Sequence, residues 1–381
     1  MSYKVIKLER HLNIITLNIL YPPDYGGVID SYYRIKALHE IGVKIHLHCF
    51  AYGRSPAREL ESLCESVEYY PRKNSFFRQF SCLPFIVNSR RSEKLLNVLT
   101  SNKFPILFDG LHTSFLLSHP ELSGRKKFVR LHNLEHNYYQ SRAEQETNLL
   151  KKLYFRLESF RLRKYEKRLT GATAVFPLSY RDHNYFRQKY GNSVCIEPFH
   201  PYNDISINAG SGNYVLYHGD MSVNENEKIA WMLVNEVFSK VEFQCIIAGR
   251  KPSGRIINLI SQYNNIKLVA DPDTGEMMDL VANAHIHLIP ASGADGFKLK
   301  LLCALVAGRH IIANRFTLMG SGEFESVIVA GSASEMVEAV TGLIKIPFDE
   351  DMISVRRRIY ASRFDNETNA AKMIETIFQE R

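Results

Sequence analysis

Two lysines stand at the predicted start of a helix in the second half of the chain. The run 293–308 (GADGFKLKLLCALVAG) directly follows an apolar stretch that predicts a β-strand. Gly296, Phe297 and Lys298 would begin the helix, and Lys300 would lie in its first turn. The free N–H groups and the dipole at a helix N-terminus favour phosphate, and lysine adds positive charge. The pattern therefore predicts a phosphate or diphosphate site.

A histidine, a carboxamide and a carboxylate follow another predicted strand, at residues 127–131. Side chains just beyond the carboxyl end of a parallel strand point into the ligand crevice of an α/β sheet. His132 and Asn133 are suited to hydrogen bonding with sugar hydroxyls, and Glu135 to accepting a proton. Asp109 occupies a similar position after the preceding strand. These residues are candidates for binding an acceptor or a sugar.

The same stretch has a structural alternative. Asn133 would also serve as a helix N-cap, and a histidine here would also serve as a buried hydrogen-bonded residue. His132 and His136 have i, i+4 spacing, but two histidines without a third ligand make a weak metal motif. We therefore predict no metal site.

Two adjacent glycines, Gly26 and Gly27, separate the first predicted strand from the helix that follows it. Glycine lets the backbone approach a ligand closely, and the helix start offers N–H groups to an anion. A tight strand-to-helix turn without a ligand is the alternative.

Three further residues in the second half follow strand ends or start a helix. Gly219 and Arg250 each follow a predicted strand, and Lys228 lies near a helix start. Lysine and arginine there would compensate diphosphate charge. Solvated surface side chains are the alternative for both cations.

The elements that must position these residues alternate along the chain. Short β-branched runs and amphipathic helical stretches predict an α/β protein with parallel sheets. The predicted strands are 13–20, 44–50, 67–70, 106–109, 127–131, 174–177, 194–197, 214–218, 243–248, 266–269, 286–290, 310–313 and 327–330. The predicted helices include 30–41, 149–169 and 366–378.

Length and composition bound the class of protein. With 381 residues, two domains are expected, and residues 200–213, rich in Pro, Asn, Ser and Gly, predict a linker between them. A composition of 45% hydrophobic and 23% charged residues is typical of a globular protein. Neither a membrane-spanning helix nor a signal peptide is predicted, so we expect a cytoplasmic location. The six cysteines show no CxxC spacing, which argues against a zinc or disulfide framework.

The net charge of +8 favours polyanionic partners. Cations alternate with aromatic residues over 69–91, and residues 149–169 contain eight lysines and arginines. Such surfaces suit an anionic membrane at its inner face or a lipid-diphosphate acceptor. A solvated helix face is the alternative. We predict no nucleic-acid partner, because no nucleic-acid-binding motif is present.

Several of these segments together resemble the retaining group-1 glycosyltransferases, a family 4-like group with the GT-B fold. The resemblance rests on residues 22–27 with Arg34 and Leu38, on 130–135 in the form R-x-H-N-x-E, and on 293–308. The last matches the family pattern G-x-G-x-K-x-K-x-x-E-A-x-A-x-G. The resemblance implies two Rossmann-like domains facing across a cleft, with a C-terminal helix that crosses back to the first domain.

The resemblance also implies roles for the residues. Residues 1–203 would form the acceptor domain, 212–365 the nucleotide-sugar donor domain, and 366–381 the returning helix. His132 and Lys298 would be catalytic. The donor would be bound by Gly26, Gly27, Gly219, Lys228, Arg250, Asp295, Gly296, Phe297, Lys300 and Cys303. No cofactor or metal is implied, and the acceptor would be a glycan or a lipid-linked glycan.

The sequence departs from the family pattern at two positions. Cys303 stands where the family has a ribose-binding glutamate, and Asp295 matches the earlier acidic position only loosely. Losing a charged hydrogen bond of this kind costs roughly 1.5–3 kcal/mol. Glu323 and Glu325 are alternative acceptors. The main prediction is thus sugar transfer from a nucleotide-diphosphate sugar, and the alternative is a catalytically degenerate GT-B protein that binds a glycan or a partner protein.

Overall fold

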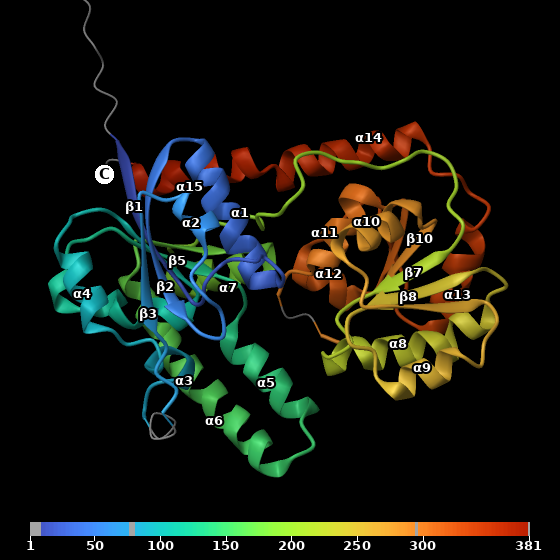
Figure 1. The fold of residues 1–381 in the computed structure, drawn as a ribbon, viewed down its shortest axis with the longest axis horizontal. Helices are drawn as coiled ribbons and strands as arrows, with labels where there is room; N and C mark the ends of the chain where they lie inside the picture. The colour runs from blue at the N-terminus through green and yellow to red at the C-terminus, as the bar shows by residue number, and fades with distance from the viewer. Residues whose placement is uncertain (1–8, 76–80, 294–295, 380–381) are drawn as a thin grey trace, which may run out of the picture. The chain divides into compact units, whose positions relative to one another are not determined.

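The protein is described by a computed structural model, which covers residues 9–75, 81–293 and 296–379. The chain divides into two compact units. Unit 1 comprises Met1–Pro201 together with Asn366–Arg381, and unit 2 comprises Tyr202–Asp365. Each unit is an α/β body with its own sheet and its own hydrophobic core (Figure 1).

In the described part of unit 1, parallel strands form a six-stranded sheet in the order β3-β2-β1-β4-β5-β6. The strands are β1 (Arg10–Thr16), β2 (Val43–Ala51), β3 (Ser66–Pro71), β4 (Ile106–Asp109), β5 (Lys127–Leu131) and β6 (Ala174–Pro177). The helices are α1 (Gly26–Glu40), α2 (Arg58–Glu61), α3 (Phe85–Asn88), α4 (Glu93–Thr100), α5 (Glu135–Gln145), α6 (Leu149–Tyr165), α7 (Tyr180–Tyr190) and α15 (Asn366–Phe378).

Both faces of this sheet are covered, and β1, β4, β5 and β6 are buried over most or all of their length. Alternate residues of β1 point to opposite faces: Ile14 joins one core cluster and Ile15 the other. The first cluster includes side chains of α1 and of α15, which pack against each other within unit 1. The C-terminal helix therefore completes the core of the unit that the N-terminal strand begins.

Unit 2 repeats this design, with its described parallel strands in the order β12-β11-β10-β7-β8-β9. The strands are β7 (Val215–His218), β8 (Cys245–Gly249), β9 (Ile266–Ala270), β10 (Ile286–Ile289), β11 (His310–Ala313) and β12 (Ile328–Val329). The helices are α8 (Asn224–Glu236), α9 (Gly254–Ile260), α10 (Thr274–Asn283), α11 (Leu299–Ala307), α12 (Arg315–Ser321), α13 (Ala333–Leu343) and α14 (Glu350–Ile359).

Two strand predictions differ from the structure. The first strand ends at Thr16, because the Thr16 hydroxyl donates to the carbonyl of Asn18 and the Asn18 side chain accepts from Ile19 and Tyr52. The prediction of a strand at 194–197 was wrong. This segment runs beside β6, and the N–H groups of Val194 and Ile196 donate to β6. The carbonyl groups of Ile196 and Glu197, however, accept from the buried side chain of Arg130 and not from another strand.

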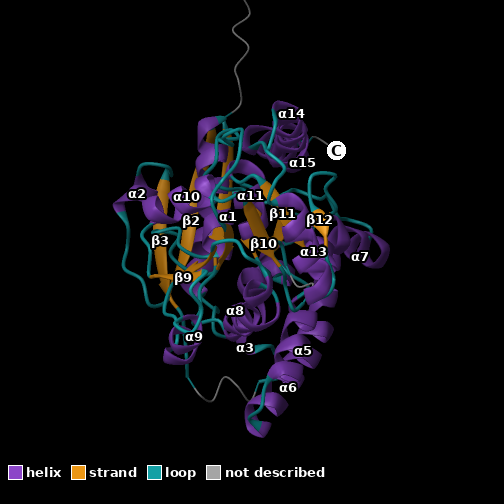
Figure 2. Cartoon of the chain, turned by 90° about the vertical axis from the view of Figure 1, so that its right-hand side faces the viewer, coloured by secondary structure: helices purple, strands orange, loops and turns teal. Residues whose placement is uncertain are grey.

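Helices α5 and α6 form a hairpin (Figure 1 and Figure 2). The predicted helix over 149–169 is α-helical only to Tyr165 and continues as a 3₁₀ segment, Glu166–Gly171. The carboxylate of Glu166 accepts from His136 of α5 and from three side chains of α7, namely Tyr185, Lys189 and Tyr190. These partners outweigh the effect of burial and lower the pKa of Glu166 to about 2. One buried carboxylate thus fixes the base of the hairpin to α7.

Candidate functional site

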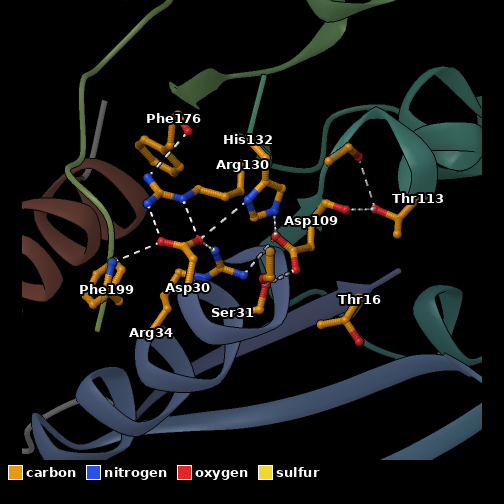
Figure 3. A network of polar contacts seen from close by, with 12 residues as sticks. Thr16, Asp30, Ser31, Arg34, Asp109, Thr113, Arg130, His132, Phe176 and Phe199 are labelled. Carbon is orange, nitrogen blue, oxygen red and sulfur yellow. Dashed lines mark hydrogen bonds and ion pairs between the residues drawn. The ribbon is translucent and has the colours of Figure 1, made fainter. Parts of the chain in front are cut away.

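A buried polar network lies where β4, β5 and helix α1 meet in unit 1 (Figure 3). Asp30 of α1 is its centre. Its carboxylate accepts from the Nε and Nη2 atoms of Arg130 at 3.1 and 2.6 Å, from Arg34 at 2.8 Å and from the backbone N–H of Phe199 at 3.0 Å. Burial raises the pKa of Asp30, but the charges of Arg130 and Arg34 outweigh it and lower the pKa overall.

Asp109, at the end of β4, is the second carboxylate of this network. One oxygen forms an ion pair with Arg34 at 3.0 Å and contacts His132 Nε2 at 2.9 Å, and the other accepts from the Ser31 hydroxyl. Here too the neighbouring positive groups outweigh burial, and the pKa of Asp109 is held well below its usual range. The structure therefore brings the predicted residues Asp109 and His132 together.

The position of His132 decides what it is able to do. An ionised Asp109 accepts a hydrogen bond from His132 Nε2–H, so in a neutral ring the proton is on Nε2 and Nδ1 is the lone-pair atom. Nδ1 is buried, has no hydrogen-bond partner among the described residues, and lies 3.9 Å from Asp30. The side chain is only 10% exposed.

Asp30, Asp109 and His132 have ligand-type atoms within 4.8 Å of one another. Such a set resembles a metal site in composition. Both carboxylates, however, are already paired with guanidinium groups, from Arg34 and Arg130. The two guanidinium groups therefore compensate the negative charge without a metal ion, and a metal ion would have to displace an arginine.

Glu135 and Asn133 lie beside this network, at the start of α5. Glu135 is buried, and desolvation raises its pKa to about 7, although His132, Asn133 and Arg90 act in the opposite direction. Asn133 is a hydrogen-bond partner of this carboxyl group and does not cap the helix, whose N-cap is Leu134. A carboxyl group that titrates near neutral pH is suited to proton exchange with a hydroxyl.

This raised pKa gives a prediction for stability. Between pH 4.5 and 7 folded Glu135 keeps a proton that the unfolded chain has released, so its contribution to stability falls as the pH rises. Glu135→Gln has no proton to lose. The unfolding free energy of the variant relative to wild type should therefore increase by about 3 kcal/mol from pH 4.5 to pH 7.5. Urea unfolding at several pH values measures this difference. A difference independent of pH, like that expected for the exposed control Glu121→Gln, would contradict it.

Gly26 and Gly27 are the first two residues of α1. A Cβ atom at Gly27 would meet nothing within 4 Å, so packing alone does not require glycine there. Tyr25 is the N-cap and makes no side-chain capping bond. The start of this helix therefore keeps its N–H groups free of a side-chain cap, beside open space, as an anion site would need.

In unit 2, two glycines at neighbouring strand ends are in close backbone contact. A Cβ atom at Gly249 would lie 1.8 Å from the carbonyl oxygen of Gly219, and one at Gly219 would lie 3.0 Å from the side chain of Asn226. Arg250, the next residue, lies 4.0 Å from Asp220 and is exposed, as is Lys228 on α8. The strand-end glycines are thus required by backbone packing, whereas both cations lie at the surface.

The predicted phosphate-binding lysines lie at the start of α11. Lys298 is the N-cap residue, and its backbone N–H donates to Ser321 Oγ at 3.0 Å. The ammonium group of Lys300 lies 5.0 Å from the centre of the Tyr217 ring. Burial, together with the charge of Lys298, lowers the pKa of Lys300 to about 8. Two ammonium groups placed in this way would gain from an anion between or beside them.

The remaining donor candidates are placed differently. Gly296 has a left-handed φ of 64°, which favours glycine, and Phe297 packs edge-on against Phe364 in the core. Cys303 is buried in the core beside Ala248 and Tyr202. Asp295 lies outside the described residues. Of the alternative acceptors, Glu325 pairs with Arg358 and Glu323 is exposed.

Sequence reasoning missed Asp30 and the role of Arg130. A signal for Asp30 exists: Asp30 and Arg34 are charged residues at i, i+4 spacing on a helix face otherwise occupied by Val28, Ile35 and Leu38. Charges on an apolar stripe are retained only when they are paired. The sequence did not reveal that Asp30 also pairs with Arg130, which lies 100 residues further along the chain.

No protein-family model matches the chain. It is 24% identical over 330 residues to a Klebsiella pneumoniae protein described as an uncharacterized 44.6 kDa protein in the cps region, an alignment that covers 81% of this chain and 84% of that protein.

Solved structures match nearly the whole chain. Sucrose-phosphate synthase from Thermosynechococcus elongatus has a TM-score of 0.67 at 16% identity, covering 96% of this chain and 98% of that one. A glycosyltransferase from Rickettsia africae has a TM-score of 0.65 at 13% identity, covering 98% and 100%. Anabaena HepE, solved with UDP and glucose, has a TM-score of 0.63 at 13% identity, covering 97% and 99%. The chain therefore has the GT-B fold, and the predicted fold class is confirmed.

Proposed function

We propose that this protein is a glycosyltransferase that moves a sugar from a nucleotide-diphosphate sugar to an acceptor hydroxyl. The observation that carries the proposal is the end-to-end match to GT-B glycosyltransferase structures. The relative in a cps region favours polysaccharide or glycolipid synthesis as the setting. The acceptor would then be a glycan or a lipid-linked glycan at the inner face of a membrane.

Unit 2 is proposed to hold the donor. The nucleotide would lie at the carboxyl ends of β7 and β8, where Gly219 and Gly249 pack closely against their neighbours. Lys298 and Lys300, at the start of α11, would compensate the charge that builds on the departing diphosphate. In this arrangement the protein supplies the positive charge with its own side chains.

Unit 1 is proposed to bind the transferred sugar and the acceptor. The ring of His132 is held in one orientation by Asp109, and Asp109 is held in turn by Arg34 and Ser31. Such fixed groups lower the cost of orienting a substrate, because they do not need to reorganise. Glu135, with a pKa near 7, is the residue proposed to exchange a proton with the acceptor hydroxyl. We further propose a hexosyl donor and retention of configuration, which rest on the sequence resemblance alone.

A thermal-shift screen against UDP, GDP, ADP, CMP and their sugar conjugates tests the proposal. A ligand at a hundred times its Kd stabilises the folded state by about 2.7 kcal/mol. For a unit of this size the melting temperature should then rise by roughly 5–10 °C. One nucleotide series should produce this shift, and the matching nucleotide sugar should release nucleotide when acceptor is added. No shift with any nucleotide at millimolar concentration would overturn the proposal.

A further inference from the structure

Helix α6 carries large apolar side chains on its solvent-facing side. The exposed fractions are 80% for Leu149, 79% for Leu150, 65% for Leu153, 44% for Leu157 and 67% for Phe160. At 100° per residue, all five lie within about 100° of one another around the helix axis. The opposite side of α6 packs inward on α5 and the core through residues such as Leu162 and Tyr165. The exposed stripe is therefore a second apolar face, which the fold of unit 1 does not use.

The charges on α6 are almost all positive. Within Leu149–Tyr165 the cations are Lys151, Lys152, Arg156, Arg161, Arg163 and Lys164. The single acidic residue of the helix, Glu158, is buried and ion-paired with Arg161 at 2.8 Å. Arg156 and Arg163 border one side of the apolar stripe and Arg161 the other, while Lys164 lies at its C-terminal end. The exposed face thus combines an apolar centre with a border of Arg156, Arg163 and Lys164, and the one acid on the helix pairs with Arg161 instead.

We propose that α6 is an interfacial helix that docks unit 1 on an anionic lipid bilayer. Leucine and phenylalanine would enter the boundary between headgroups and acyl chains, while the bordering lysines and arginines would contact the lipid phosphates. The composition favours a bilayer over a protein partner, because protein interfaces concentrate their binding energy in Trp, Tyr and Arg, and leucine is under-represented there. No described helix is long and apolar enough to cross a membrane, so the contact would be peripheral.

This inference deepens the proposed function by naming the surface that presents a lipid-linked acceptor. Docking itself requires neither a donor sugar nor catalysis. Vesicle binding tests the docking inference and nucleotide binding tests the proposed function. A negative result in one experiment therefore does not decide the other.

The experiment is vesicle sedimentation of the full-length protein. Vesicles of phosphatidylglycerol and phosphatidylethanolamine are compared with vesicles of phosphatidylcholine alone, at low and at physiological salt. The apolar variant is Leu150→Ser/Leu153→Ser/Phe160→Ser, and its control, with apolar residues of unit 2 that are 44–52% exposed, is Trp231→Ser/Ile257→Ser/Phe316→Ser. The charge variant is Arg156→Gln/Arg163→Gln/Lys164→Gln, and its matched control is Lys240→Gln/Arg255→Gln/Lys345→Gln.

Wild-type protein should sediment with anionic vesicles and not with phosphatidylcholine. Each α6 variant should lower the partition coefficient on the order of a hundredfold, because each surface cation contributes about 1 kcal/mol and apolar burial is comparable. Both unit 2 controls should bind like wild type. Circular dichroism and melting temperature report whether the α6 variants stay folded. Equal binding by folded α6 variants and wild type would overturn the inference. So would a wild-type dimer, seen by analytical ultracentrifugation, that the apolar variant converts to monomer without any vesicle binding.

Discussion

Asp30→Asn should destabilise unit 1 by about 3–5 kcal/mol, the range measured when one partner of a buried ion pair is removed. The side chain of Asp30 is 2% exposed and compensates two guanidinium groups that are fully buried. Asparagine has nearly the same size, so the substitution changes the charge with little change in packing. Arg130 would then remain buried without a carboxylate partner, beside the backbone carbonyl groups of Phe176, Ile196 and Glu197.

Differential scanning calorimetry checks this expectation, since the transition of unit 1 should fall by roughly 6–20 °C. Glu68→Gln is the matched control. Glu68 pairs with Lys94 at 2.8 Å, but at 42% and 64% exposure the pair lies in solvent. Exposed pairs contribute less than about 1 kcal/mol. A loss for Asp30→Asn no larger than that of the control would show that the network does not carry the stability assigned to it.

Lys298→Ala should lower kcat for sugar transfer by roughly a hundred- to a thousandfold, the effect of removing one preorganised group that stabilises charge in a transition state. The variant should remain folded, because alanine keeps the backbone N–H that holds the helix start on Ser321 Oγ. Initial rates with saturating donor and acceptor measure the effect, and thermal melting confirms the fold.

Lys240→Ala, an exposed lysine elsewhere in unit 2, is the control and should turn over like wild type. Turnover of Lys298→Ala equal to that of the control would remove Lys298 from the mechanism. A parallel loss of melting temperature would instead assign it a structural role.

The fold was largely readable from the sequence because buried parallel strands leave an unambiguous pattern. The runs 106–109, 127–131, 174–177 and 310–313 coincide with β4, β5, β6 and β11. Residues 194–197 have the same β-branched character, yet they do not form a strand. The carbonyl groups of Ile196 and Glu197 accept hydrogen bonds from Arg130. No local sequence pattern shows which distant side chain competes for a backbone group.

The candidate site was readable only in part, for a related reason. Strand-end position was enough to select Asp109 and His132, and they are in contact at 2.9 Å. It was not enough to find Asp30, whose partner Arg130 comes from β5, because a pairing across 100 residues depends on how the strands are ordered in the sheet. Lys298 and Lys300 were found because a glycine loop before a helix is a local signal, whereas their ligand remains a proposal.

The buried carboxylate at the base of the α5–α6 hairpin has a consequence for how the protein would meet a bilayer. Glu166 joins α5 to α7 through His136, Tyr185, Lys189 and Tyr190, so the base of the hairpin is fixed to the body of unit 1. Unit 1 would therefore not rotate freely relative to a docked α6, which is about 26 Å long. The attachment would instead fix the orientation of unit 1, so that its sheet has one tilt relative to the membrane plane and His132 has one height above the lipid phosphates.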